Sequence, residues 1–218
     1  MALNLIMLGP PGAGKGTQAE RFARTRGIPK ISTGEILREA VQAGTEIGLR
    51  AKSVMDRGEL VGDEVMIGIV RDRLQRPDAL SGFILDGFPR TVAQASALDA
   101  MLDGRDPLIV VDIVVPEQEL IRRLSTRLIC KECGQTAPSG DELSSRCRKC
   151  SGELVQRTDD SQGVVRERLR IYHASTEPVV NFYRARPTFR SIDGAQAADQ
   201  VAADLAAAIA AAGNGNVR

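Results

Sequence analysis

One stretch decides the fold: Gly9-Pro10-Pro11-Gly12-Ala13-Gly14-Lys15-Gly16-Thr17, which directly follows the apolar run from Leu3 to Leu8. It matches the pattern G-x-x-x-x-G-K, in which glycines let backbone N–H groups turn inward onto phosphate oxygens and the lysine adds a positive charge. A buried strand, this loop and the positive end of a following helix together predict a P-loop. One position departs from the common pattern, because Gly16 stands where Ser or Thr usually ligates Mg²⁺, and Thr17 comes one residue later.

The P-loop predicts binding of a nucleoside triphosphate, and the composition narrows the possible partners. The chain has 218 residues, enough for one α/β domain with insertions, and a formal net charge of +1. This charge argues against nucleic acid or a membrane surface as a partner, and most of the 29 basic residues are arginines, which suit a compact phosphate ligand. No basic segment precedes the short opening apolar run, so we expect a soluble cytoplasmic protein.

The four cysteines form two knuckles, Cys130-x-x-Cys133 and Cys147-x-x-Cys150. This spacing is close to that of a zinc ribbon, and four thiolates leave no coordination position for water. We therefore expect structural Zn²⁺ that braces a small subdomain. Structural disulfides are disfavoured in a cytosolic chain, while unligated cysteines and an Fe–S cluster are the alternatives.

Alternating strands and helices predict the architecture, an α/β fold with a doubly wound, five-stranded parallel sheet of the P-loop NTPase type. The expected strands are residues 3–8, 29–31, 82–85, 108–115 and 188–193. The expected helices are residues 14–26, 35–43, 46–57, 63–76 with Asp63 as its cap, 91–103, 117–127, 160–173 followed by an interruption at Pro178, and 197–212.

A second motif, Phe83-Ile84-Leu85-Asp86-Gly87-Phe88-Pro89-Arg90, places a carboxylate at the end of an apolar strand. Open parallel sheets bind ligands at this edge, so Asp86 is expected to hold Mg²⁺ through bound waters. The alternative is an aspartate that only caps a turn. Arg90 has the reach to bind a second phosphate group.

Taken together, the motifs resemble those of the adenylate kinases, within the nucleoside monophosphate kinase family, of the long bacterial type with a zinc-bearing lid. The resemblance covers nearly the whole chain in the family's order and approximate spacing. Its segments are Gly9 to Thr17, Ile31-Ser32-Thr33-Gly34 with Leu37-Arg38, Leu85 to Thr91 with Gln94, and Arg157 to Asp160 with Arg166 and Arg168.

The resemblance implies reversible, Mg²⁺-dependent phosphoryl transfer from ATP to AMP, giving two ADP. It implies a core of residues 1–31, 62–123 and 161–218, an AMP-binding lobe of residues 32–61 and a zinc-binding lid of residues 124–160. A monomer is expected, because closure of the two lobes about a central site needs both to be free. The attacking AMP phosphate oxygen is already an anion, so no general base is expected in a chain with one histidine. His173 is expected to be structural.

The resemblance also implies roles for individual residues. The ATP site would comprise Gly12, Ala13, Gly14, Lys15, Gly16, Thr17, Arg123, Arg127 and Gly194. The AMP site would comprise Thr33, Arg38, Glu59, Leu60, Val61, Gly87, Arg90, Gln94, Arg157 and Arg168. The catalytic cations would be Lys15, Arg90, Arg123, Arg157 and Arg168. Asp159 and Asp160 are expected to pair with lid arginines in the closed state.

The sequence departs from the family in the lid, where the segment between the cysteine pairs is shorter and lacks the usual Tyr-His and Pro-Pro steps. Three other functions share part of this pattern. A UMP/CMP kinase shares most motifs, but Thr33 with Gln94 favours adenine. A kinase of small hydroxylated metabolites would need a base and no second arginine clamp. A P-loop switch with a nucleic-acid- or protein-binding zinc ribbon is supported by Lys131, Arg146, Arg148 and Lys149 and opposed by Glu132, Asp141, Glu142 and Glu153.

Overall fold

The computed structural model describes residues 2–138 and 146–214. Within them, strands and helices alternate along the chain as the sequence predicts. The elements are β1 (Leu3–Leu8), α1 (Lys15–Arg26), β2 (Lys30–Ser32), α2 (Thr33–Gln42), α3 (Glu46–Asp56), α4 (Asp63–Leu74), η1 (Pro77–Ala79), β3 (Gly82–Asp86), α5 (Val92–Met101), β4 (Leu108–Val114), α6 (Glu117–Ser125), β5 (Leu128–Cys130), β6 (Leu154–Gln156), η3 (Thr158–Asp160), α7 (Gln162–Ile171), η4 (Tyr172–Thr176), α8 (Glu177–Arg184), β7 (Phe189–Asp193) and α9 (Ala198–Asn214).

The central sheet of the described residues has five strands in the order β2-β3-β1-β4-β7, and every neighbouring pair is parallel. The predicted α/β fold with a five-stranded parallel sheet is thereby confirmed. β1 lies in the centre, with Met7 in register with Asp86 on β3 and Leu8 in register with Asp112 on β4. The P-loop and Asp86 therefore emerge side by side at the carboxyl edge of the sheet, where ligands bind in such folds.

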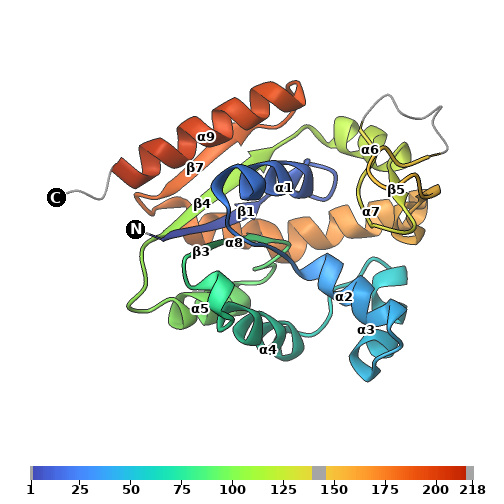
Figure 1. The fold of residues 1–218 in the computed structure, drawn as a ribbon, viewed down its shortest axis with the longest axis horizontal. Coiled ribbons are helices and arrows are strands. Elements are labelled where there is room, and N and C mark those ends of the chain that lie inside the picture. The colour runs from blue at the N-terminus through green and yellow to red at the C-terminus, as the bar shows by residue number, and fades with distance from the viewer. Residues whose placement is uncertain (1, 139–145, 215–218) are drawn as a thin grey trace.

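Helices cover both faces of this sheet and bury its apolar side chains in two clusters. α1 and α9 pack on one face, while α4, α5 and α8 pack on the other; Figure 1 shows α9 above the strands and α4 and α5 below them. The β1 side chains Leu5 and Ile6 are fully buried, one in each cluster. Each such side chain contributes about 1.5–3 kcal/mol relative to exposure, so the strand that carries the P-loop is firmly fixed.

The P-loop has backbone angles that only glycine adopts readily. Gly9 has a φ of +131°, and a Cβ atom there would lie 2.5 Å from the carbonyl oxygen of Ile113. Gly14 has a φ of +90° and precedes α1 without a side-chain cap. Because Gly14 offers no side chain, it does not cap the first N–H groups of α1, which face the loop. Uncapped N–H groups at a helix N-terminus are available to bind an anion.

The segment between β2 and α4 folds back on itself as a pair of helices, α2 and α3. Their contact is close, since a Cβ atom at Gly48 would lie 2.1 Å from the carbonyl oxygen of Ala40. Thr45 caps α3 by accepting a 3.1 Å hydrogen bond from the N–H of Gly48. Figure 1 shows this helix pair projecting from the core on the side where β5 and α6 lie.

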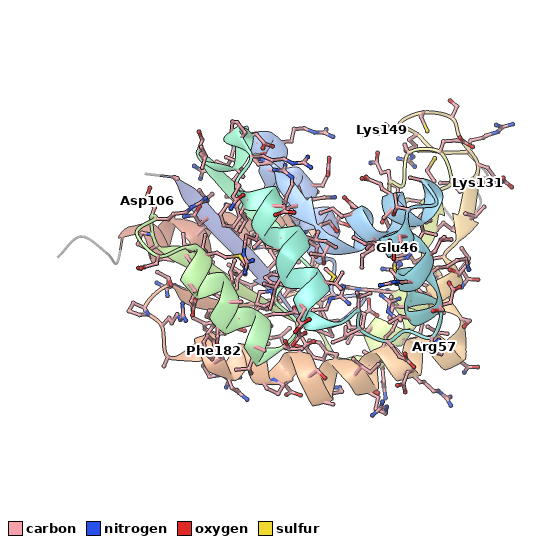
Figure 2. All side chains as sticks on the ribbon, turned by 90° about the horizontal axis from the view of Figure 1, so that it is seen from below. Glu46, Arg57, Asp106, Lys131, Lys149 and Phe182 are labelled. Carbon is pink, nitrogen blue, oxygen red and sulfur yellow. The ribbon has the colours of Figure 1, made fainter. Side chains whose placement is uncertain are left out.

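β5 and β6 form an antiparallel two-stranded sheet that carries the cysteine knuckles. In Figure 2, Lys131 and Lys149 mark this end of the molecule, together with Glu46 and Arg57 of the helix pair, whereas Asp106 lies at the opposite end. The inner part of the expected lid, residues 139–145 with Asp141 and Glu142, lies outside the described residues. No helix among residues 2–138 and 146–214 is long and apolar enough to cross a bilayer.

The helix expected from Asp160 to His173 differs in two respects. Asp160 ends the short 3₁₀ turn η3, and α7 begins only at Gln162. The helix is also not interrupted at Pro178: it widens into a π-turn at Tyr172–Thr176 and continues as α8, with Pro178 in the first turn. The N–H of Glu177 bonds to the carbonyl of Tyr172, five residues back, where an α-helix would pair residues four apart. This change in backbone pairing comes just before Pro178, which has no N–H to donate, so the helix continues through the proline.

Candidate active site

The P-loop faces a cavity of about 880 Å³. The cavity extends from the loop to α2, the segment after β3, α6, the base of the β5–β6 hairpin and the turn before α9. The residues predicted from sequence that line it are Gly12, Ala13, Gly14, Lys15, Gly16, Thr17, Arg38, Leu60, Asp86, Gly87, Arg90, Arg123, Arg127, Arg157, Arg168 and Gly194. Residues as far apart in the sequence as Gly12 and Gly194 therefore line the same cavity.

A second, smaller pocket of about 70 Å³ shares Arg38, Gly87 and Arg90 with the first. It brings in the remaining predicted residues Glu59, Val61 and Gln94. Thr33 is not among the lining residues of either cavity; it is buried, and its hydroxyl donates a 2.8 Å hydrogen bond to the carbonyl of Gly87. Glu59 turns outward and pairs with Arg57.

Lys15 holds its ammonium group inside the P-loop. Its Nζ donates hydrogen bonds to the carbonyl oxygens of Gly9 and Pro10 at 2.7 and 2.8 Å. Burial lowers the pKa of Lys15 to about 8, although the nearby Asp86 carboxylate opposes this shift. An anionic ligand at this position favours the charged form and raises the pKa again. The loop is therefore prepared for a phosphate group.

The carboxylate of Asp86 lies against the P-loop. A Cβ atom built on Gly16 would come within 3.2 Å of its Oδ2, and the Ser32 hydroxyl is 3.4 Å from the same oxygen. A side chain at position 16 would require this carboxylate to shift by a few tenths of an ångström, whereas glycine leaves it in contact with the loop. Carboxylate oxygen next to a phosphate cradle is the donor chemistry that Mg²⁺ prefers, so the residues present fit that ion.

Three partly buried arginines, Arg38, Arg90 and Arg168, line the cavity. Burial lowers the pKa of Arg38 and of Arg168 to about 10, and neighbouring arginines add to both shifts. Burial also lowers the pKa of Arg90, although the Asp86 carboxylate opposes it. Guanidinium groups stay charged in proteins, so the cavity is cationic and suited to bidentate phosphate contacts.

Two aspartates at the base of the hairpin, Asp159 and Asp160, bind Arg168 and two further arginines, Arg127 and Arg157. Asp160, whose side chain is 0% exposed, accepts hydrogen bonds from Arg127 at 2.6 and 2.7 Å and from Arg168 at 2.8 Å. Asp159 accepts from Arg157 Nε at 2.8 Å and lies 3.1 Å from Arg168. Burial opposes ionisation of Asp159, but Arg168 and Arg157 outweigh it and lower its pKa to about 2. Both aspartates thus pair with arginines in this structure, with Arg127 and Arg157 from the expected lid range and with Arg168 from α7.

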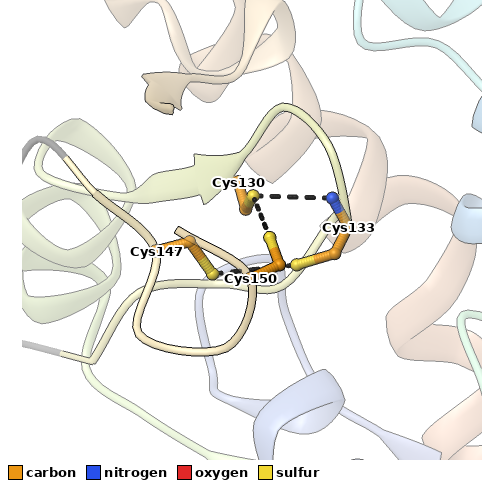
Figure 3. Close-up of side chains that lie close together, drawn as sticks. All are labelled: Cys130, Cys133, Cys147 and Cys150. Carbon is orange, nitrogen blue, oxygen red and sulfur yellow. Dashed lines mark hydrogen bonds between the residues drawn. The ribbon is translucent and has the colours of Figure 1, made fainter. Parts of the chain in front are cut away.

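The four cysteine thiols converge at the tip of the β5–β6 hairpin (Figure 3). All four sulfur atoms lie within 4.8 Å of one another, with Cys130 to Cys150 at 3.4 Å and Cys133 to Cys147 at 3.7 Å. These distances far exceed a disulfide bond and are close to the edge of a ZnS₄ tetrahedron, about 3.8 Å for a Zn–S bond of about 2.3 Å. Backbone N–H groups of Cys133 and Lys149 point at the sulfurs of Cys130 and Cys147. The cluster fits a tetrahedral thiophilic metal.

Comparison with known proteins places this arrangement in a family. The family model for adenylate kinase matches residues 7–188, from the end of β1 to the residue before β7. The chain belongs to the adenylate kinase family. It is 54% identical over 199 residues to the adenylate kinase of Archaeoglobus fulgidus, covering 88% of this chain and 91% of the relative. It is 48% identical over 204 residues to that of Thermodesulfovibrio yellowstonii, covering 91% and 95%, and 45% identical over 210 residues to that of Magnetococcus marinus, covering 94% and 99%.

The structure of this adenylate kinase family member adds residues that sequence reasoning missed. Asp63 was expected to cap α4, but Gly62 precedes the helix, and the Asp63 carboxylate instead accepts hydrogen bonds from Thr91 and Gln94. Glu119 binds Arg123 at 2.7 Å. Its position four residues before Arg123 on a helix is the signal that could have revealed this pair.

Proposed function

We propose that this chain catalyses reversible phosphoryl transfer from MgATP to AMP, giving two ADP. Membership of the adenylate kinase family makes it a phosphotransferase. The observation that carries the proposal is the composition of the cavity: it is lined by the P-loop and also by Arg38 and Arg90, two partly buried arginines that line the small second pocket as well. Two phosphorylated ligands can thus meet in one space.

On the donor side, the backbone N–H groups of Gly12 to Thr17 and the ammonium of Lys15 would hold the ATP phosphates. Arg123 and Arg127 line the cavity from α6 and from just beyond it, where they would approach the γ-phosphate, and Gly194 would lie near the adenine of ATP. A Cβ atom at Gly194 would come within 2.4 Å of Ile113, so glycine lets this turn pack closely against the end of β4.

On the acceptor side, Arg38 and Arg90 would hold the AMP phosphate. The small pocket lined by Leu60, Val61 and Gln94 would receive its adenine ring, and Thr33 would stabilise the wall through Gly87. Arg157 and Arg168 line both cavities, which suits cations that contact the phosphoryl group as it passes between the nucleotides.

The chemistry needs positioning and charge neutralisation rather than a base. An oxygen of the AMP phosphate attacks the γ-phosphorus of ATP, a P–O bond forms, and the bond to the β–γ bridging oxygen breaks with its electron pair leaving on ADP. Lys15, Arg123, Arg157 and Arg168 would stabilise the negative charge on the transferring group. Bound Mg²⁺, held by Asp86 through water, would supply further neutralisation of the ATP phosphates.

Closure of two lobes would exclude water from this reaction. We assign residues 32–61 to an AMP-binding lobe, residues 124–160 to a lid, and residues 1–31, 62–123 and 161–218 to the core. The hydroxyl of Thr158 lies 3.4 Å from Asp56, so the base of the lid and α3 already approach each other. Because both lobes must be free to move against the core, we propose that the protein is a monomer. We also propose that it works in the cytoplasm.

The test is steady-state transfer from MgATP to AMP, CMP, UMP and GMP in parallel, with a reaction lacking acceptor to measure hydrolysis. We expect transfer to AMP to dominate and ATP loss without acceptor to be small, because closure excludes water. Transfer chiefly to CMP or UMP would favour the UMP/CMP kinase. Hydrolysis without transfer would favour a P-loop switch.

For the cysteine cluster we propose structural Zn²⁺ held by Cys130, Cys133, Cys147 and Cys150. We expect about one zinc per chain by elemental analysis, and loss of that metal on chelation or in Cys147→Ser. Because the hairpin has few apolar side chains of its own, metal loss should make this segment sensitive to protease and raise the KM for ATP. Ser125→Ala, which removes a hydroxyl near the hairpin base, should keep its zinc. A purified chain without bound metal and with a protected hairpin would contradict the assignment.

A further inference from the structure

We propose that Asp63 is a positioning residue that locks the Gln94 amide in one orientation, and that this lock makes the acceptor site select bases with an amino group over bases with a keto group. The inference rests on the proposed function, since it concerns the base bound beside Gln94. It assigns a task to a carboxylate that lies outside both the phosphate-binding residues and the metal sites.

Both ends of the Gln94 amide are engaged. Its Nε2 donates a 2.7 Å hydrogen bond to Oδ1 of Asp63, and its Oε1 accepts a 2.8 Å hydrogen bond from the backbone N–H of Arg90. Gln94 is only 2% exposed, and it lines the small pocket. Water therefore has little access to replace either partner.

The two partners impose the same orientation independently. A carboxylate such as Asp63 only accepts, and a backbone N–H such as that of Arg90 only donates. Rotating the amide by half a turn would place its oxygen against the carboxylate and its NH₂ against the N–H, so both hydrogen bonds would be lost in a buried place. The orientation of Gln94 is consequently fixed.

Asp63 is itself held in place. Its second oxygen, Oδ2, accepts a 2.9 Å hydrogen bond from the hydroxyl of Thr91, and Thr91 in turn caps α5 by accepting a 3.2 Å bond from the N–H of Gln94. Asp63 begins α4, while Thr91 and Gln94 belong to the start of α5. The lock therefore joins two core helices and would not depend on movement of the lobe.

A locked amide can offer a ligand only one pattern: the second N–H of Nε2 as donor and the second lone pair of Oε1 as acceptor. Adenine matches this pattern, because its ring N1 accepts and its 6-amino group donates. Hypoxanthine and guanine present the reverse, with a protonated N1 that donates and a 6-keto oxygen that accepts. Cytosine resembles adenine in this respect and uracil resembles guanine. The lock thus distinguishes amino from keto bases, whereas the size of the pocket must distinguish purines from pyrimidines.

The experiment compares kcat/KM for AMP with kcat/KM for IMP, whose base differs from adenine at this edge. In the natural protein we expect a strong preference for AMP. In Asp63→Asn the side chain at 63 can donate as well as accept, so Gln94 can turn toward the keto base. We expect the AMP-to-IMP ratio to fall about tenfold, since one of the two locking hydrogen bonds no longer opposes the turn. The N–H of Arg90 should preserve part of the preference.

Asp78→Asn is the matched control, because Asp78 pairs with Arg73 near the other end of α4 and is exposed. Its AMP-to-IMP ratio should equal that of the natural protein. An unchanged ratio in Asp63→Asn would overturn the inference, and so would a parallel loss of activity with both acceptors, which a purely structural role predicts. If Asp63→Asn does not fold, Asp63→Ser with the dissociation constants of AMP and IMP by calorimetry gives the same comparison. A natural protein that phosphorylates no AMP would instead overturn the proposed function.

Discussion

Replacing Lys15 with methionine is expected to lower kcat/KM for phosphoryl transfer by about 1000-fold or more. The Nζ of Lys15 lies within the P-loop, hydrogen-bonded to the carbonyl oxygens of Gly9 and Pro10. When a triphosphate binds, this charge becomes a preorganised donor to the transferring group, and removal of one such donor costs about 10²–10³ in rate. Loss of a full charge in a buried site adds to that cost. The measurement is steady-state transfer from MgATP to AMP at saturating and at low ATP.

The pH dependence of ATP binding separates this effect from simple misfolding. The pKa of Lys15 in the free protein is lowered to about 8 by burial, and a bound polyphosphate favours its charged form. Binding must therefore take up a proton once the pH rises above about 8, and ATP affinity should weaken there. Lys15→Met should lack this dependence while keeping its melting temperature within a few degrees. A variant with nearly full activity would exclude Lys15 from the transfer step.

The sequence was sufficient to predict the elements that depend on short local patterns. The P-loop, the apolar strands around Leu5 and Val110, and Asp86 at the end of β3 are all encoded by neighbouring residues, because glycine conformations shape the loop and short continuous apolar runs mark strands that are buried on both faces. The cysteine knuckles were visible for the same reason. In each case the residues that make the feature are close in the chain.

Contacts between distant segments could not be predicted in this way. Asp63 and Gln94 are 31 residues apart, and nothing in either local pattern indicates the partner. Asp160 was expected to pair with lid arginines, but no local pattern identified Arg127, 33 residues away, as the one it binds. Asp63 was interpreted as a helix cap because aspartate is common there, and tertiary hydrogen bonds gave it another role. The π-turn before Pro178 was missed because proline usually ends a helix, whereas here the altered pairing of the preceding turn accommodates it.

Asp160→Ala is expected to be the most destabilising of the single substitutions considered, by about 3–5 kcal/mol. The carboxylate is fully buried and shared by Arg127 and Arg168, so its removal leaves two guanidinium groups next to each other without their common partner. For a chain of this size such a loss corresponds to a melting temperature lower by about 10 °C. Because both arginines line the cavity, the rate of transfer should fall as well. Thermal unfolding and steady-state kinetics on the same preparation measure both effects.

Two comparisons show whether burial of the carboxylate is the cause. Glu167→Ala breaks an arginine–carboxylate pair of similar geometry on α7, the helix that carries Arg168, with Arg170 at 2.7 and 2.8 Å. That pair is exposed, so its loss should leave the melting temperature nearly unchanged. Asp159 supplies the pH test: its pKa is lowered to about 2, so its pairing with Arg157 and Arg168 stabilises the fold above the unfolded value of about 3.9. That contribution should disappear as the pH falls from about 4 to about 2. In Asp159→Ala the free energy of unfolding should therefore fall less steeply over this pH range than in the natural protein. Equal melting temperatures for Asp160→Ala and Glu167→Ala would mean that the arginines find other partners, and that the aspartates at the base of the lid are not what hold Arg127 and Arg168 over the cavity.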